Sequence, residues 1–132
     1  MALLPPLVLL VEDDKSIREY AAEVLREAGY VVLAASTADE ALFRIEQDGA
    51  AIDVLFTDIA LPGLVSGFEL ARLAKARNPR IEVIYSTDFV ETVNQAAAPA
   101  DAVDRLLRKP YSRKELEAEM MRAVNGDRRG RP

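Results

Sequence analysis

Acidic, hydroxyl and basic side chains follow four of the five short apolar runs in this sequence of 132 residues. They are Glu12, Asp13 and Asp14 after residues 7–11, Asp58 after residues 53–57, Thr87 and Asp88 after residues 81–86, and Lys109 after residues 104–108. Carboxylates brought close together repel one another, and a bound cation relieves that repulsion. Mg²⁺ prefers carboxylate and water ligands, and a lysine ammonium suits a phosphate oxygen. If these side chains meet, they can bind Mg²⁺ and stabilise a phosphoryl group.

The apolar runs have the composition of β-strands that are buried on both faces. They cover residues 7–11, 30–34, 53–57, 81–86 and 104–108. They are rich in Val, Ile and Leu and lack the alternation of apolar and polar residues that a half-buried strand shows. Helical spacing and helix-end signals predict helices at 16–29, 36–49, 67–78 and 112–124, with a poorly marked helix near 89–98.

Strand and helix patterns alternate along the whole chain. This alternation predicts right-handed βαβ crossovers and an α/β fold, a three-layer α/β/α sandwich around a five-stranded parallel sheet. All strands of such a sheet point the same way, so their carboxyl ends lie along one edge, where ligands bind. The polar residues that follow the strands are therefore predicted to converge.

Cysteine and histidine are both absent from the sequence. Their absence excludes disulfides, thiolate catalysis, Ser-His-Asp catalysis and almost every zinc site, so any metal must be held by oxygen. The formal charge of −5 argues against a nucleic-acid surface. The apolar start at residues 1–11 has no basic region and is interrupted by Pro5 and Pro6, which argues against a secretory signal or a membrane span and favours a cytoplasmic protein.

Each polar residue also has an ordinary structural explanation. Acids such as Glu12, Asp13 and Asp14 often cap helices, and an acid such as Asp58 often begins a turn. Threonine is common in strands, and a lysine at a strand end is commonly solvated. These explanations are reasonable one by one, but together they do not account for four strand ends that carry polar groups to one edge.

Four motifs in order resemble the receiver domain of two-component response regulators. They are "VLLVEDD", "LFTDIALPG" followed by "SGFEL", "VIYSTDF" and "LLRKPYSRKEL". The resemblance covers residues 7–125 and implies the flavodoxin-like, CheY-like fold with strand order 2-1-3-4-5. It predicts a receiver domain over residues 1–125, followed by a flexible tail at 126–132.

The resemblance implies a role for each matching residue of the site. Asp58 matches the phosphoacceptor, which attacks the phosphorus of a phosphohistidine on a partner kinase. Asp13 matches a direct Mg²⁺ ligand, and Glu12 an indirect one that acts through water. The backbone carbonyl of Ala60 completes the protein's share of the ligands. The chemistry implied is in-line phosphoryl transfer, in which catalysis is mostly positioning and charge stabilisation.

Two further positions match the family's switch. Thr87 matches the hydroxyl that turns toward the phosphoryl group, and Lys109 matches the lysine that pairs with it. The bond into the matching proline is cis in the family, so a cis peptide bond is expected between Lys109 and Pro110.

Three features depart from the family's usual pattern. Asp88 stands where Ala or Gly is usual and adds a negative charge at the mouth of a phosphate site. Leu106 replaces a common aromatic residue that moves with the switch hydroxyl. The loop after Asp58, "PGLVSG", is one residue longer than the commonest form.

The leading hypothesis is a stand-alone receiver, which is not a turnover enzyme and takes its phosphoryl group from a sensor histidine kinase or a histidine phosphotransfer protein. An output domain is not expected after Val124, so the signal is expected to pass to an unknown downstream protein by contact, through residues 89–98, 104–108 and 112–124. A weak homodimer is compatible with this hypothesis, whereas nucleic-acid and membrane partners are not expected.

Two alternatives remain open. The first is a pseudo-receiver, motivated by Asp88, that binds partners without being phosphorylated. The second is a Mg²⁺-dependent phosphatase with an Asp nucleophile. It is disfavoured because Ala60, two residues after Asp58, leaves no second acid to act as general acid.

Overall fold

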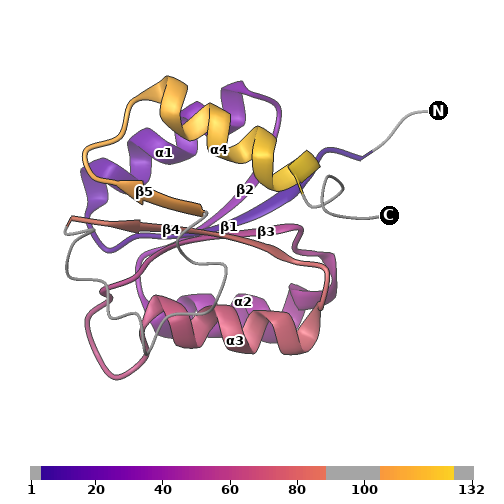
Figure 1. Ribbon diagram of the computed structural model, residues 1–132. Helices are drawn as coiled ribbons and strands as arrows, with labels where there is room; N and C mark the ends of the chain where they lie inside the picture. The colour runs from indigo at the N-terminus through magenta and orange to yellow at the C-terminus, as the bar shows by residue number, and fades with distance from the viewer. Residues whose placement is uncertain (1–3, 89–104, 127–132) are drawn as a thin grey trace.

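The computed structural model describes residues 4–88 and 105–126, and it confirms the predicted α/β/α sandwich. Figure 1 shows helices α1 and α4 on one face of a central sheet and helices α2 and α3 on the other. The strands are β1 (Leu7–Val11), β2 (Val31–Ala35), β3 (Val54–Asp58), β4 (Glu82–Thr87) and β5 (Leu106–Arg108). The helices are α1 (Lys15–Glu27), α2 (Ala38–Asp48), α3 (Gly67–Arg77) and α4 (Arg113–Gly126), and a 3-10 turn, η1, spans Gly49–Ala51.

The sheet is parallel throughout and has the order β2-β1-β3-β4-β5, as the resemblance implies. Val11 pairs with Thr57, and Asp58 pairs with Ser86, so the carboxyl ends of β1, β3 and β4 lie side by side. Strand β3 runs one residue further than predicted because Asp58 is still paired with β4. The acid is therefore held by the sheet itself rather than by the loop that follows.

The side chains of β1 enter two apolar layers in alternation. Leu9 and Val11 pack with α2 and α3, whereas Val8 and Leu10 pack with α1 and α4. All four side chains are buried. Because both faces of the strand meet a helix layer, both faces must be apolar, and this explains why the sequence shows no alternation.

Side-chain caps fix where each helix begins. The oxygens of Asp14, Thr37, Ser66 and Ser112 accept hydrogen bonds from the backbone amides of Ile17, Glu40, Glu69 and Glu115, respectively. Glu115 also accepts from the Ser112 amide, which completes a capping box at the start of α4. These caps give partners to backbone amides in the first turn, which have none within the helix.

Two expectations lie outside the described residues. They are the poorly marked helix near 89–98 and residues 127–132 of the predicted tail, whereas Gly126, predicted to begin the tail, is the last residue of α4. Among the helices that the structure describes, none has both the length and the apolar character needed to cross a membrane.

Candidate functional site

Three carboxylates meet at the carboxyl edge of the sheet. Glu12 and Asp13 follow β1, and Asp58 ends the neighbouring strand β3. Each contributes a carboxylate oxygen to a group whose members all lie within 4.8 Å of one another. Glu12 and Asp58 are 2% and 6% exposed, whereas Asp13 is exposed at the mouth. The cluster thus has a buried floor and an open side.

Asp14, the third acid of the run, does not join this cluster. Its Oδ1 atom accepts from the amide of Ile17 at 3.1 Å and caps helix α1. Its own amide donates to Glu12 Oε2 at 3.1 Å, which helps to hold Glu12 in place. The capping explanation is therefore correct for Asp14, while Glu12 and Asp13 belong to the acidic group.

Lys109 joins the two buried acids. Its Nζ atom lies 2.7 Å from Glu12 Oε1 and 3.0 Å from Asp58 Oδ2. Lys109 follows β5, and its backbone amide donates to the carbonyl of Thr87 at 2.8 Å. The Lys109–Pro110 peptide bond is cis, as the resemblance implies. One ammonium thus neutralises part of the charge of two buried carboxylates.

Burial and the Lys109 contacts act in opposite directions on the acids. Burial raises the pKa of the Glu12 and Asp58 carboxyls, and the hydrogen bonds from Lys109 only partly offset this rise. Burial lowers the pKa of the Lys109 ammonium, but its bonds to Glu12 and Asp58 outweigh burial, so this pKa lies above its ordinary value. In the folded protein without a metal ion, burial therefore disfavours the charged forms of Glu12 and Asp58.

The remaining two predicted site residues lie at the same edge. Thr87 is buried at the end of β4, the strand next to Asp58. The backbone amide of Ala60 donates to Asp58 Oδ1 at 3.3 Å, so this loop residue contacts the phosphoacceptor candidate. The role of the Ala60 carbonyl as a ligand stays a prediction.

Gly67 is a site residue that the sequence reasoning missed. A Cβ atom at this position would lie 2.2 Å from the backbone oxygen of Asp58, and the Gly67 amide donates to the carbonyl of Ile59 at 2.9 Å. The first residue of α3 therefore packs directly on the end of β3, and only glycine fits. A glycine as the first residue of a predicted helix, a position that does not need its conformational freedom, was the available signal.

A pocket of about 390 Å³ adjoins the acidic group on the side of Lys109. Its lining consists of Ser16, Ile17, Tyr20, Asp88, Lys109, Pro110 and Tyr111. Tyr111 is buried, and its ring lies 5.8 Å from that of Phe56. Burial, followed by the charges of Glu12 and Asp58, raises the pKa of the Tyr111 hydroxyl. Asp88 is exposed, so its extra charge stands at the rim rather than inside the site.

The donor set fits Mg²⁺. All the side-chain donors are carboxylate oxygens, two of the three belong to buried residues, and the third is open to solvent. Mg²⁺ binds through one or a few carboxylates and keeps several waters, which a site with an open side allows. Zinc prefers nitrogen and sulfur ligands, and this chain has no histidine or cysteine to supply them.

Comparison with protein families identifies the group to which this site belongs. The model of the response regulator receiver domain matches residues 8–121. The chain belongs to the response-regulator receiver family. Receiver domains are the phosphoacceptors of two-component signalling, they interact with histidine kinases or phosphotransfer proteins, and they generally bind Mg²⁺ at an acidic pocket.

Individual relatives include receivers in proteins of very different size. The response regulator receiver protein CpdR of Brucella abortus is 31% identical over 115 residues, which are 86% of this chain and 92% of that protein. The sensor kinase CckA of the same organism is 34% identical over 109 residues, which are 83% of this chain but only 11% of the kinase. A solved receiver domain from Clostridium thermocellum superposes with a TM-score of 0.81 at 28% identity, over 93% of this chain and 97% of that one.

Replacing Asp58 by Asn is expected to stabilise the metal-free receiver at neutral pH, by about 1–2 kcal/mol. Burial raises the pKa of Asp58 in the folded protein above its value in the unfolded chain. The contribution of Asp58 to the free energy of unfolding is therefore fully present below the unfolded-state pKa, and it is lost as the pH rises through the folded-state pKa. Asn does not titrate, so the advantage of the variant is expected to shrink as the pH falls from about 7 to about 4. Thermal melts across this range measure the difference.

Asp39→Asn is the matched control for this prediction. Asp39 is exposed in the first turn of α2, where the helix dipole favours a negative charge, so its replacement is not expected to stabilise the protein. Added Mg²⁺ is expected to stabilise the wild type more than Asp58→Asn. Equal or lower stability of Asp58→Asn without metal at neutral pH would contradict the inference that burial disfavours the charged Asp58 carboxylate.

Proposed function

We propose that this receiver accepts a phosphoryl group on Asp58 from a phosphohistidine of a sensor histidine kinase or histidine phosphotransfer protein, in a Mg²⁺-dependent reaction. The observation that carries the proposal is the Lys109 ammonium, 3.0 Å from Asp58 and 2.7 Å from Glu12. The ammonium is one positive charge beside a nearly buried carboxylate, which lies within 4.8 Å of the carboxylate of the exposed Asp13. This arrangement suits a nucleophile whose product carries added negative charge.

In the proposed step, one carboxylate oxygen of Asp58 attacks the phosphorus of the phosphohistidine. A phosphorus–oxygen bond forms as the phosphorus–nitrogen bond breaks, and the imidazole leaves with the electron pair. The product is an aspartyl phosphate, a mixed anhydride that water hydrolyses with time. The receiver is therefore consumed and regenerated as a phosphoacceptor, and it does not turn over a substrate.

Asp13, Asp58 and the backbone carbonyl of Ala60 are the proposed ligands of Mg²⁺, with Glu12 acting through water. When bound, the ion supplies positive charge that neutralises the carboxylates and the phosphoryl oxygens. The protein's own part is to hold Asp58 at the strand end and to keep Lys109 beside it. The amide of Ala60, which already donates to Asp58 Oδ1, further orients the nucleophile.

The switch is proposed to follow from the added charge. A phosphoryl group brings close to two negative charges to Asp58, which draws the Lys109 ammonium and the Thr87 hydroxyl toward it. Thr87 and Lys109 are already linked by a backbone hydrogen bond between β4 and the end of β5. Leu106 on β5 is half-buried, so this strand carries an aliphatic side chain where the family often has an aromatic one.

The signal is proposed to pass to a downstream protein through contacts near β5 and α4. A stand-alone arrangement, with a receiver domain at residues 1–125, would resemble CpdR, of which this chain covers 92%. The match to the larger kinase CckA gives an example of the other arrangement. The stand-alone arrangement, the cytoplasmic location and a weak homodimer stay predictions.

A pseudo-receiver is the second candidate, and Asp88 is the observation that favours it. Its exposed carboxylate lines the same pocket as Lys109. A negative charge at this rim opposes the approach of an anionic phosphodonor. A pseudo-receiver would bind its partners with the same surface but would not be phosphorylated.

Binding of beryllofluoride, a phosphoryl mimic, separates the two candidates. In NMR spectra of the wild type with Mg²⁺, the amide signals of Asp58, Ala60 and Thr87 are expected to shift when beryllofluoride is added. Asp88→Ala is expected to bind it more tightly, because the opposing charge is gone. A wild type that ignores beryllofluoride at all Mg²⁺ concentrations would favour the pseudo-receiver.

A further inference from the structure

Arg18 in the first turn of α1 reaches back to the loop that carries two of the three acids. Its Nη1 atom donates to the backbone carbonyl of Glu12 at 2.9 Å and lies 3.5 Å from that of Asp13. Its backbone amide donates to the carbonyl of Asp14 at 2.9 Å. The side chain is half-buried, so these bonds are partly shielded from water. The Arg18 side chain thus contacts two successive carbonyls between β1 and α1, and its backbone amide makes a first hydrogen bond of the helix.

Few backbone hydrogen bonds of regular secondary structure hold this loop in place. Strand β1 ends at Val11, and the amide of Glu12 makes a last bond to the carbonyl of Ala35. Helix α1 begins after its cap, Asp14. The Glu12 and Asp13 carbonyls therefore lie between two elements, and a planar guanidinium with several donors can satisfy neighbouring carbonyls at once.

We infer that Arg18 is a positioning residue that fixes the backbone of Glu12 and Asp13 so that their carboxylates are arranged to bind Mg²⁺. The inference rests on the proposed function, because it concerns the same metal site. Groups that orient the ligands of a metal change its affinity by about 10- to 100-fold when they are removed. Arg18 contacts the backbone of the acids and not the place where the ion would sit, so its effect is indirect.

The sign of the effect separates positioning from simple charge. Arg18 is a cation, and a cation near a metal site weakens binding of another cation. If charge were its only influence, replacing Arg18 by Met would strengthen Mg²⁺ binding. If Arg18 positions the loop, the same replacement weakens Mg²⁺ binding.

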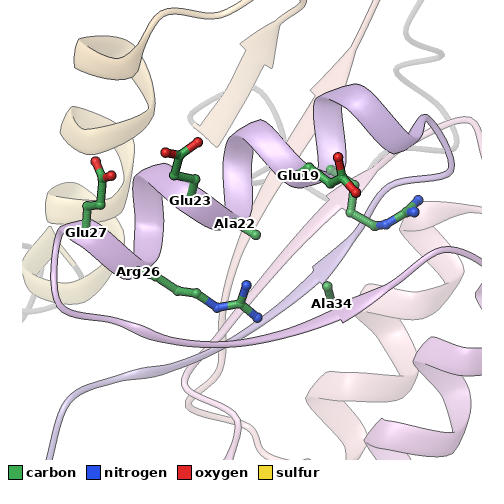
Figure 2. Close-up of a pocket in the computed structure, with 7 residues that line it drawn as sticks. Glu19, Ala22, Glu23, Arg26, Glu27 and Ala34 are labelled. Carbon is green, nitrogen blue, oxygen red and sulfur yellow. The ribbon is translucent and has the colours of Figure 1, made fainter.

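Arg26 offers a matched control on the same helix. Its Nη2 atom donates to the backbone carbonyl of Val32 on β2 at 3.1 Å. Arg18 and Arg26 both line a groove of about 370 Å³ along α1, and Figure 2 shows Arg26 extending from the helix across toward the strand that bears Ala34. Arg26 thus makes the same kind of bond in the same groove, but to a carbonyl remote from the acids.

The test is a Mg²⁺ titration of the full chain, followed by the amide NMR signals of Asp13, Asp58 and Ala60. Arg18→Met is expected to raise the Kd for Mg²⁺ about tenfold. Arg18→Lys keeps the positive charge but loses the planar guanidinium with its several donors, and it is expected to raise the Kd less. Arg26→Met is expected to leave the Kd within about twofold while lowering the melting temperature. If Arg18→Met does not fold, the Kd values of Arg18→Lys and Arg26→Met are compared instead. A larger rise in the Kd for Arg18→Lys supports the positioning role, and an equal or smaller rise contradicts it.

The outcomes distinguish this inference from the function on which it rests. An unchanged or lower Kd in Arg18→Met, with normal binding by the wild type, would overturn the positioning role and leave the phosphoacceptor proposal in place. An equal rise in Kd for Arg18→Met and Arg26→Met would also overturn it, because the effect would then be a general loosening of α1. A wild type that does not bind Mg²⁺ would overturn both proposals.

Discussion

Replacing Lys109 by Met is expected to destabilise the metal-free receiver by about 3–5 kcal/mol, the usual loss when one partner of a buried ion pair is removed. Lys109 contacts both Glu12 and Asp58, each of which is almost fully buried. Its loss leaves two carboxylates without a counter-charge in a region where burial already raises their pKa values. Chemical denaturation in metal-free buffer measures the change in the free energy of unfolding.

Lys114→Met provides the control, since Lys114 is exposed in the first turn of α4. Its replacement is expected to change the free energy of unfolding by less than about 0.5 kcal/mol. Mg²⁺ is expected to restore part of the stability lost in Lys109→Met, because a divalent cation can neutralise the same carboxylates. A loss below about 1 kcal/mol for Lys109→Met would show that the ion pairs contribute little to the fold.

Replacing Gly67 by Ala is expected to cost about 3 kcal/mol and to shift the NMR signals of Asp58. The added Cβ would lie 2.2 Å from the Asp58 backbone oxygen and 3.0 Å from its carbonyl carbon. Both are backbone atoms of a paired strand, so they cannot move aside without displacing the phosphoacceptor candidate. Weaker Mg²⁺ binding is expected to accompany the loss of stability.

Gly29→Ala separates this steric effect from the general cost of replacing a glycine. Gly29 has a φ of 100°, and a Cβ added there would meet no atom within 4 Å. Its replacement is expected to cost about 1 kcal/mol by backbone strain alone and to leave the signals of Asp58 unchanged. Equal losses for the two variants, with no change at Asp58, would contradict the close packing of α3 on β3.

The convergence of Glu12, Asp13, Asp58 and Lys109 could be predicted because it follows from topology. Parallel strands bring their carboxyl ends to one edge, and buried strands are easily found from apolar runs. The length of the strands could be predicted only to within a residue or two. Asp58 was expected just after its strand, whereas the structure pairs it with Ser86 inside the sheet.

The contacts of the site could not be predicted from the sequence, because they depend on side-chain and backbone geometry. Three successive acids look alike in the sequence, but the turn between β1 and α1 makes Asp14 the cap and places Asp13 in the cluster. The bridge by Lys109 joins residues far apart in the chain, and the bond from Arg18 to the Glu12 carbonyl involves backbone that has no sequence signature.

Transfer of a phosphoryl group to the wild type and to Asp58→Asn, with the modified residue located by mass spectrometry, tests the central claim most directly. The donors are candidate histidine kinases and histidine phosphotransfer proteins, with and without Mg²⁺. The expected result is a single base-labile modification on Asp58 that requires Mg²⁺ and is absent from the variant. Equal labelling of Asp58→Asn, or modification of a residue other than Asp58, would contradict the assignment of this carboxylate as the phosphoacceptor.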